Sequence, residues 1–183
     1  MLLDKIKALA AEHQADNIAT RRHLHANPEL SYQEFETSKY VQARLTEIGI
    51  PFTVIATTGV LGIIEGKNPT KRVIALRADM DALPIIEENK IDYKSTNEGV
   101  MHACGHDVHT TILLGAAKVL WTLRDEFEGT IKLLFQPGEE KLPGGGKLLM
   151  ENGILERLGV SEIYGLHTSP KFPVGKIALK NGP

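Results

Sequence analysis

Hydrophobic positions recur along the chain at two spacings, one typical of helices and one typical of buried strands. Apolar residues three and four positions apart predict helices over residues 2–26, 32–48, 110–123 and 144–151. Short apolar runs bounded by turn residues predict strands over residues 52–56, 60–65, 73–76, 130–135, 162–166 and 176–179. Because strands alternate with helices over most of the length, the pattern indicates an α/β layer architecture.

Local signals indicate where several of these elements begin and end. Ser31 is the expected N-cap of the second helix, with Glu34 three residues later as its capping-box partner, and Gly49 is the expected stop. Residues 84–100 have the composition of a long polar loop. The chain ends in a predicted turn over 180–183 instead of a finished domain edge, which suggests that more chain once followed.

One short segment concentrates groups that bind metals. The eight residues from His102 to His109 include three histidines, an aspartate and the only cysteine of the chain. Thiolate and imidazole are preferred ligands of zinc and related divalent ions, and Gly105 allows the backbone to turn so that Cys104 and His106 face one ion. A lone cysteine or histidine would be interpreted as a core residue. Four such side chains where a loop enters a helix favour a metal site.

Three further strand ends carry polar groups suited to the same site. They follow successive apolar runs and are Asp79, the pair Glu139 and Glu140, and His167. Taken singly, each is more often a solvated turn or a structural residue. Because loops at the carboxyl ends of strands converge on one rim of an open α/β sheet, their joint occurrence predicts a single site. Of two adjacent glutamates there, one can bind a metal while the other takes a proton from water.

Composition and charge narrow the class of function. The 183 residues are 42% hydrophobic with a formal net charge of -2, which is typical of a globular domain and offers no basic surface for nucleic acid. No apolar stretch approaches the roughly 20 residues that cross a bilayer, and the charged start lacks the apolar core of a signal peptide. A single cysteine cannot form an internal disulfide. The sequence therefore predicts a cytoplasmic protein without nucleic-acid or membrane partners.

Five stretches resemble those of a known enzyme family and occur in the same order. They are RRHLHANPELSYQEFET at 21–37, RADMDALPI at 77–85, MHACGHDVHTT at 101–111, LLFQPGEE at 133–140 and GLHTSP at 165–170. The chain resembles the zinc-dependent aminoacylase and carboxypeptidase group. Within that group it resembles the branch of bacterial N-acyl-amino-acid amidohydrolases, hippurate hydrolases and indole-acetyl-amino-acid hydrolases. The pair HACGHDVHTT and FQPGEE is the most specific part of the match.

The resemblance implies a role for each candidate residue. Four match the metal ligands of the branch: Cys104, His106, Glu140 and His167. Glu139 matches the general base and Asp79 the aspartate behind the metals. The resemblance also implies two divalent ions (zinc, manganese, cobalt or nickel) and a small N-acyl amino acid as substrate. The implied fold is a zinc-exopeptidase-like catalytic domain of three layers, in which helices flank a mixed sheet.

The length departs from the family pattern, since members of this branch are much longer. The resemblance implies that residues 1–183 are the N-terminal part of the catalytic domain, which is therefore incomplete. An inserted dimerisation domain and a C-terminal catalytic segment with a further histidine ligand would be absent from this chain. The full-length protein would be a homodimer, and the isolated chain would have weak activity or none.

Other functions remain open at the level of sequence. A dipeptidase or carboxypeptidase on the same scaffold is the nearest alternative, and Cys104 favours the amidohydrolase branch only by resemblance. A metal-binding fragment without turnover is a second alternative. A thiol-redox role for Cys104 is the weakest, because the chain has no second cysteine to resolve a disulfide.

Overall fold

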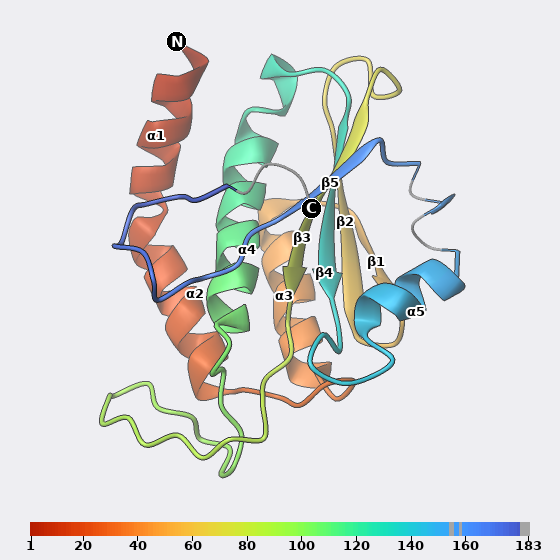
Figure 1. Cartoon of the computed structure of the whole chain (residues 1–183). Coiled ribbons are helices and arrows are strands. Elements are labelled where there is room, and N and C mark those ends of the chain that lie inside the picture. Colours follow the sequence, from red (N-terminus) through yellow and green to blue (C-terminus); the bar gives the residue numbers. More distant parts are fainter. Residues whose placement is uncertain (154–155, 158, 180–183) are drawn as a thin grey trace.

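The computed structural model describes residues 1–153, 156–157 and 159–179, and helices and strands alternate through most of them (Figure 1). The helices are α1 (Leu2–Glu12), α2 (Gln14–Ala26), α3 (Phe35–Ile48), α4 (His106–Thr122), the short 3-10 helix η1 (Arg124–Glu126) and α5 (Gly145–Glu151). The strands are β1 (Phe52–Ile55), β2 (Gly59–Glu65), β3 (Val73–Asp79), β4 (Thr130–Gln136) and β5 (Glu162–Gly165). The predicted α/β class is confirmed.

The five strands form one mixed sheet in the order β1-β2-β4-β3-β5. β1 and β2 are antiparallel, as are β2 and β4, whereas β3 lies parallel to both β4 and β5. The carboxyl ends of β3, β4 and β5 therefore lie at the same edge of the sheet. Figure 1 shows the long loop before α4 at that end of the molecule.

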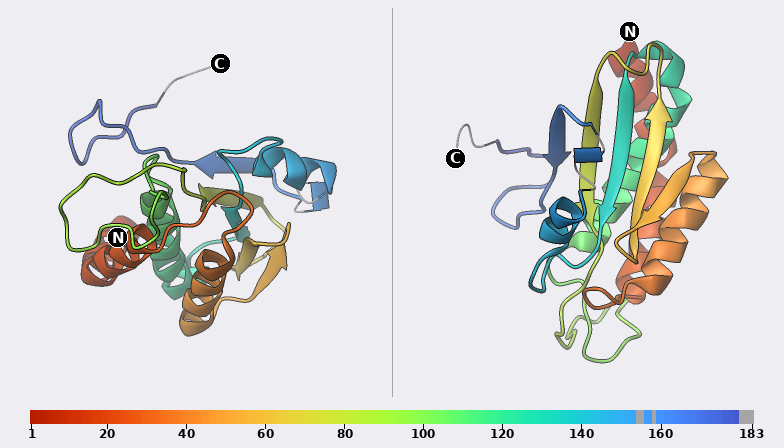
Figure 2. Two further views of the ribbon diagram at one scale, coloured as in Figure 1. Left: turned by 90° about the horizontal axis from the view of Figure 1, so that it is seen from below. Right: turned by 90° about the vertical axis from the view of Figure 1, so that its right-hand side faces the viewer.

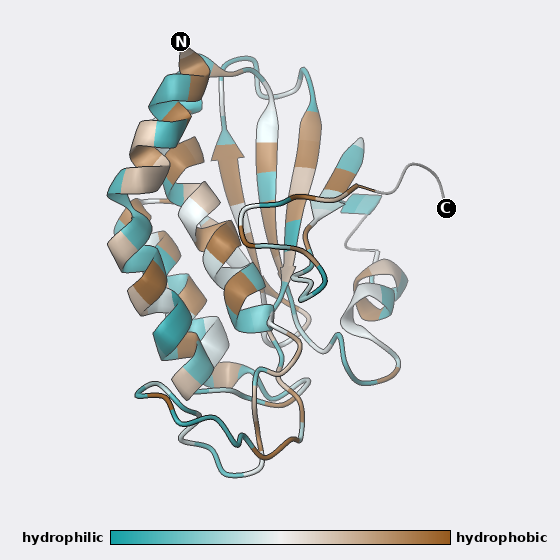
Figure 3. Cartoon of the chain, turned by 60° about the vertical axis from the view of Figure 1, so that its left-hand side comes forward, coloured by the Kyte–Doolittle hydropathy of each residue, from teal (hydrophilic) through white to brown (hydrophobic). Residues whose placement is uncertain are grey.

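Alternating side chains of the strands fill two cores, one on each face of the sheet. On one face, Leu133 and Phe135 of β4 pack in a large cluster with α3 and α4. On the other, Leu134 packs with Leu61 of β2 and Leu149 of α5. Helices thus lie on both sides of the sheet (Figure 2), and the hydrophobic colouring gathers on the strands between them (Figure 3). The three-layer arrangement follows from this alternation.

The first two helices differ from the sequence prediction. The helix predicted over residues 2–26 is divided at His13 into α1, which has no buried residue, and α2, which buries three. The capping box of Ser31 and Glu34 is wrong, because neither side chain caps α3. The carboxylate of Glu29 accepts the backbone N–H groups of residues 36 and 37 instead. Gly49 ends α3 in the left-handed conformation, as predicted.

The bounds of the later elements also differ from the sequence prediction. α4 begins at His106, four residues before the predicted start, so the metal-binding segment includes the first turn of a helix. Residues 84–100 contain no helix or strand, as expected of a loop. Residues 176–179 form no strand: Ile177 is 80% exposed and has no neighbouring strand within the described chain. The turn predicted at 180–183 lies outside the described residues. No described helix is long and apolar enough to cross a membrane.

Candidate metal centre

The residues predicted as a site meet at the edge where β3, β4 and β5 end. Asp79 is the last residue of β3 and pairs in register with Gln136, the last residue of β4. Potential metal-binding atoms lie within 4.8 Å of one another in three overlapping sets: Cys104, His106 and His167; Asp79, His106 and His109; and His106, Glu139 and Glu140. The structure thus brings all six predicted residues together, and His106 belongs to every set.

One ring nitrogen of His106 is fixed by a hydrogen bond, and the other faces a group of carboxylates. The residue is 1% exposed, and its Nδ1 lies 2.8 Å from the carbonyl oxygen of Asp81. Nδ1–H therefore donates to Asp81, and the buried Nε2 has no hydrogen-bond partner among the residues that the structure describes. That Nε2 lies 3.6 Å from an oxygen of Asp79, 3.7 Å from one of Glu140 and 3.9 Å from one of Glu139. An orphaned imidazole nitrogen that faces carboxylates fits a divalent cation.

The electrostatics of the cluster also favour a cation. Burial lowers the pKa of His106, but the hydrogen bond to Asp81 and the charges of Asp79, Asp81 and Glu140 outweigh it, so the pKa is raised. Burial raises the pKa of the Cys104 thiol to about 12, and the nearby carboxylates, led by Glu140, act in the same direction. The raised pKa of His106, and the part of the Cys104 shift that the carboxylates add to burial, reflect an excess of negative charge, which a divalent ion would neutralise.

Cys104 and His167 approach each other from different parts of the chain. The Sγ atom of Cys104 lies 3.3 Å from Nε2 of His167, whose Nδ1–H donates to the carbonyl oxygen of Thr168 at 2.6 Å. Gly105 has φ +91°, and a Cβ atom there would lie 2.4 Å from Oγ1 of Thr168. Glycine is therefore required at this position both for the turn and for the close approach of the two loops.

His109, to which the sequence assigned no role, ties the site together and does not offer a free nitrogen. Its Nδ1–H donates to Oδ1 of Asp79 at 2.6 Å, and its Nε2 accepts the backbone N–H of Thr168 at 2.9 Å. The position of His109 one helical turn after His106 was the available signal. Burial raises the pKa of Asp79, but the hydrogen bond from His109 and the charges of His106 and Arg77 outweigh it, so the pKa is lowered.

Asp81 is a second residue that the sequence did not identify as part of the site. It is 1% exposed, and its Oδ2 accepts the hydroxyl of Ser31 at 2.6 Å and the backbone N–H of Glu140 at 2.9 Å. Its Oδ1 lies 3.3 Å from Nδ1 of His106. One carboxylate thus contacts both the histidine and the glutamate loop. The only sequence signal was the alternation Asp-Met-Asp at the end of β3.

A buried ionic network lies behind the HACGHD segment. Nδ1 of His25 lies 2.7 Å from Asp107, and its Nε2 lies 3.0 Å from Glu87. The hydrogen bond to Asp107 raises the pKa of His25 and outweighs burial, which lowers it. Glu87 also accepts the backbone N–H of Ser95, so the network links α2, the 84–100 loop and the start of α4.

Replacing His25 by alanine is expected to lower the free energy of unfolding by about 2 kcal/mol, because two buried carboxylates lose a partner. Removing one partner of a buried ion pair typically costs about 3–5 kcal/mol. The loss here is smaller, because Asp107 still pairs with Arg21 and Glu87 still accepts the backbone N–H of Ser95. Urea denaturation measures the effect. His23→Ala, an exposed histidine of the same helix, is the control and should cost less than about 1 kcal/mol. Equal losses would contradict the role given to the network.

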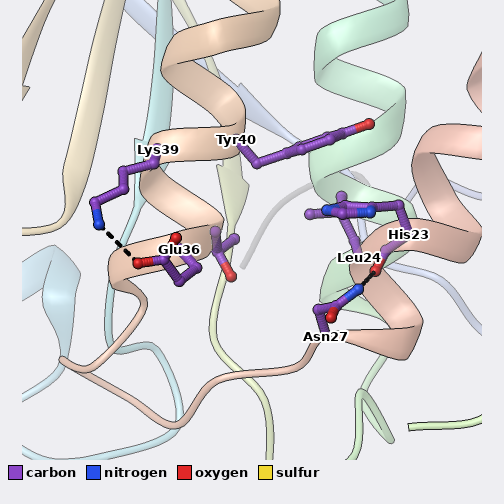
Figure 4. Close-up of a pocket in the computed structure, with 7 residues that line it drawn as sticks. His23, Leu24, Asn27, Glu36, Lys39 and Tyr40 are labelled. Atoms are coloured by element: carbon purple, nitrogen blue, oxygen red, sulfur yellow. Dashed lines mark hydrogen bonds and ion pairs between the residues drawn. The ribbon is translucent and has the colours of Figure 1, made fainter. Parts of the chain in front are cut away.

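A separate hollow of about 400 Å³ lies between α2 and α3. Figure 4 shows its wall, where the rings of His23 and Tyr40 stack with centroids 4.3 Å apart and Lys39 pairs with Glu36. None of its lining residues is among the six candidates. The hollow is therefore not part of the cluster at the strand ends.

Comparison with known proteins decides the family. The model of "Peptidase family M20/M25/M40" matches residues 75–182, which include all six candidate residues. The chain belongs to this family. The resemblance inferred from the five sequence stretches is thereby confirmed.

Relatives within the M20 family are close in sequence. The chain is 46% identical over 184 residues to an N-acyl-L-amino acid amidohydrolase of Geobacillus stearothermophilus, with 100% of this chain and 49% of that protein covered. It is 45% identical over 185 residues to thermostable carboxypeptidase 2 of Saccharolobus solfataricus, covering 100% of this chain and 46% of that protein. The chain thus spans about half the length of these curated relatives.

A solved structure matches the fold as well. The YXEP protein of Bacillus subtilis, described as a dinuclear metal binding peptidase from the M20 family, superposes with a TM-score of 0.86 at 43% identity. The match covers 97% of this chain and 48% of that one. At this identity the likeness extends beyond the general fold and supports the family membership.

Proposed function

We propose that the whole protein hydrolyses the amide bond of N-acylated amino acids, yielding a carboxylic acid and a free amino acid. The observation that carries this proposal is the convergence of the five other candidate side chains on His106, whose Nε2 has no hydrogen-bond partner among the described residues. The 46% identity to an N-acyl-L-amino acid amidohydrolase supports the choice of substrate class.

The proposed metal ligands are Cys104, His106, Glu140 and His167, and two divalent ions are expected, as in the dinuclear relative. Zinc, manganese, cobalt and nickel remain the candidates. When bound, such ions lower the pKa of a water molecule and polarise a substrate carbonyl. Asp79 accepts the hydrogen bond that orients His109, and its carboxylate places a negative charge next to the ligands.

Glu139 is the proposed general base. Its side chain is 43% exposed, so it reaches solvent and substrate, while one of its oxygens lies 3.9 Å from Nε2 of His106. It removes a proton from the attacking water and then delivers that proton to the leaving amine. Glu140, more buried at 22% exposure, is the better placed of the two to stay on a metal.

The domain organisation proposed for the whole protein extends beyond this chain. Residues 1–183 would be the N-terminal part of the catalytic domain. A dimerisation domain and a C-terminal catalytic segment with a further histidine ligand would complete a homodimer. The single cysteine supports a cytoplasmic location, and a small N-acyl amino acid is the proposed partner.

Peptide hydrolysis is the second candidate, because the chain is almost as similar to a thermostable carboxypeptidase. The whole protein, loaded with each metal in turn, should be assayed on hippurate, N-acetyl amino acids and dipeptides. We expect kcat/KM to be at least about tenfold higher on the acylated amino acids, a difference of about 1.4 kcal/mol in transition-state stabilisation. A preference for dipeptides would favour the peptidase. Metal binding without turnover would favour a metal-binding role.

A further inference from the structure

The loop of residues 138–144 carries Glu139 and Glu140 between β4 and α5, and it is held by a segment more than 100 positions earlier in the chain. That segment, residues 31–34, belongs to the RRHLHANPELSYQEFET stretch, to which the proposed mechanism gives no role. It contacts the loop directly at Gly138, Lys141 and Gly144. It also contacts the loop through Asp81, which accepts both the Ser31 hydroxyl and the Glu140 N–H.

Tyr32 makes the most extensive of these contacts. Its hydroxyl donates to the carbonyl oxygen of Lys141 at 2.7 Å and accepts the N–H of Gly144 at 3.0 Å, so it joins both ends of the second half of the loop. Its ring covers Gly138, where an added Cβ would lie 2.1 Å from Cε1 of the ring. The first half of the loop is therefore packed by the same side chain.

The backbone of Tyr32 is itself in an unfavourable conformation. Its φ is +66°, in the left-handed region that non-glycine residues rarely adopt. Such a conformation persists only where surrounding contacts impose it. Glu34 supplies one of them: its buried Oε1 accepts the N–H of Tyr32 at 2.9 Å and the N–H of Gly138 at 2.7 Å. The same carboxylate oxygen thus fixes the tyrosine and the start of the loop.

We propose that Tyr32 is a positioning residue, which fixes the backbone of the 138–144 loop and thereby the placement of Glu139 and Glu140 opposite His106. This inference rests on the proposed function for its consequences in catalysis. Its structural part, the ordering of the loop by a distant tyrosine, stands on the contacts alone. Tyr32 touches neither substrate nor metal in this scheme and acts only through the loop.

The test is Tyr32→Phe in the whole protein, since phenylalanine keeps the ring over Gly138 and removes only the hydroxyl. The backbone amides within residues 138–145 should exchange with solvent about tenfold faster, because phenylalanine removes both hydrogen bonds that the hydroxyl makes to the loop. Metal affinity should fall about tenfold, as for other changes behind a metal ligand. On N-acyl amino acids, kcat should fall about tenfold with KM little changed, because the base is misplaced while binding is kept.

Tyr40→Phe is the matched control. The Tyr40 hydroxyl makes one long hydrogen bond of 3.4 Å to Thr20 and lies outside the loop, so the control should leave exchange at residues 138–145 and kcat unchanged. Unaltered exchange in Tyr32→Phe, or faster exchange throughout the core strand β4, would overturn the proposal. If the wild-type protein fails to hydrolyse N-acyl amino acids, the proposed function fails, but the exchange measurement still decides whether Tyr32 orders the loop.

Discussion

Replacing Glu139 by glutamine should reduce amide hydrolysis by the whole protein about 1,000-fold, within the range that a general base contributes. Glutamine has the same size and keeps a polar group in place, but it cannot accept a proton from water at neutral pH. Because Glu140 and not Glu139 is the proposed ligand, metal content should stay the same. Steady-state kinetics combined with metal analysis measures both effects.

Glu98→Gln is the control for this prediction, since Glu98 is an exposed glutamate of the 84–100 loop outside the cluster. It should retain wild-type turnover. Near-normal turnover of Glu139→Gln would mean that another group is the base. Loss of metal together with turnover would instead identify Glu139 as a ligand, which its distance of 3.9 Å from Nε2 of His106 also makes geometrically accessible.

Replacing Cys104 by serine should weaken metal binding about 1,000-fold, beyond the 10- to 100-fold typical of changes behind the ligands. A hydroxyl is a much poorer ligand for these ions than a thiolate, although serine is close to cysteine in size. Calorimetric titration of metal into the metal-free whole protein measures the affinity. The fold should persist, because Cys104 is not among the buried hydrophobic residues of either core cluster.

The control for Cys104→Ser is Ser169→Ala, which alters an exposed side chain two residues after His167. It should leave metal affinity within about twofold of wild type, because surface changes away from special contacts have small effects. An unchanged affinity in Cys104→Ser would remove the cysteine from the ligand set. The two sets without the cysteine, one formed by His106, Glu139 and Glu140 and the other by Asp79, His106 and His109, would then remain as places for an ion.

The candidate residues could be predicted from the sequence because short apolar runs show where strands end. Asp79, the two glutamates and His167 each follow an apolar run, and parallel strands bring such positions to one edge whatever their separation along the chain. The structure places Asp79, Glu139 and His167 at that edge accordingly. Their roles as base and ligands stay predictions.

The supporting residues could not be found in this way, because their partners are distant in sequence. Ser31 and Glu34 have the spacing of a capping box, yet Ser31 binds Asp81, 50 positions away, and Glu34 binds Gly138, 104 positions away. A local pattern cannot distinguish a capping oxygen from one that bonds across the fold. The strand predicted over residues 176–179 was wrong for a related reason, because a strand requires a neighbouring strand that local hydrophobicity does not reveal.

The separation of the clustered side chains along the chain has a consequence for folding. Cys104 and His167 are 63 positions apart, and they meet only when β3 and β5 are paired at the edge of the sheet. Contacts between distant segments form late, after the entropy of closing long loops has been overcome. An ion held by these residues would bind the native state far more tightly than any partly folded state that precedes it. It would therefore act chiefly by slowing unfolding, with little effect on the rate at which the chain first folds.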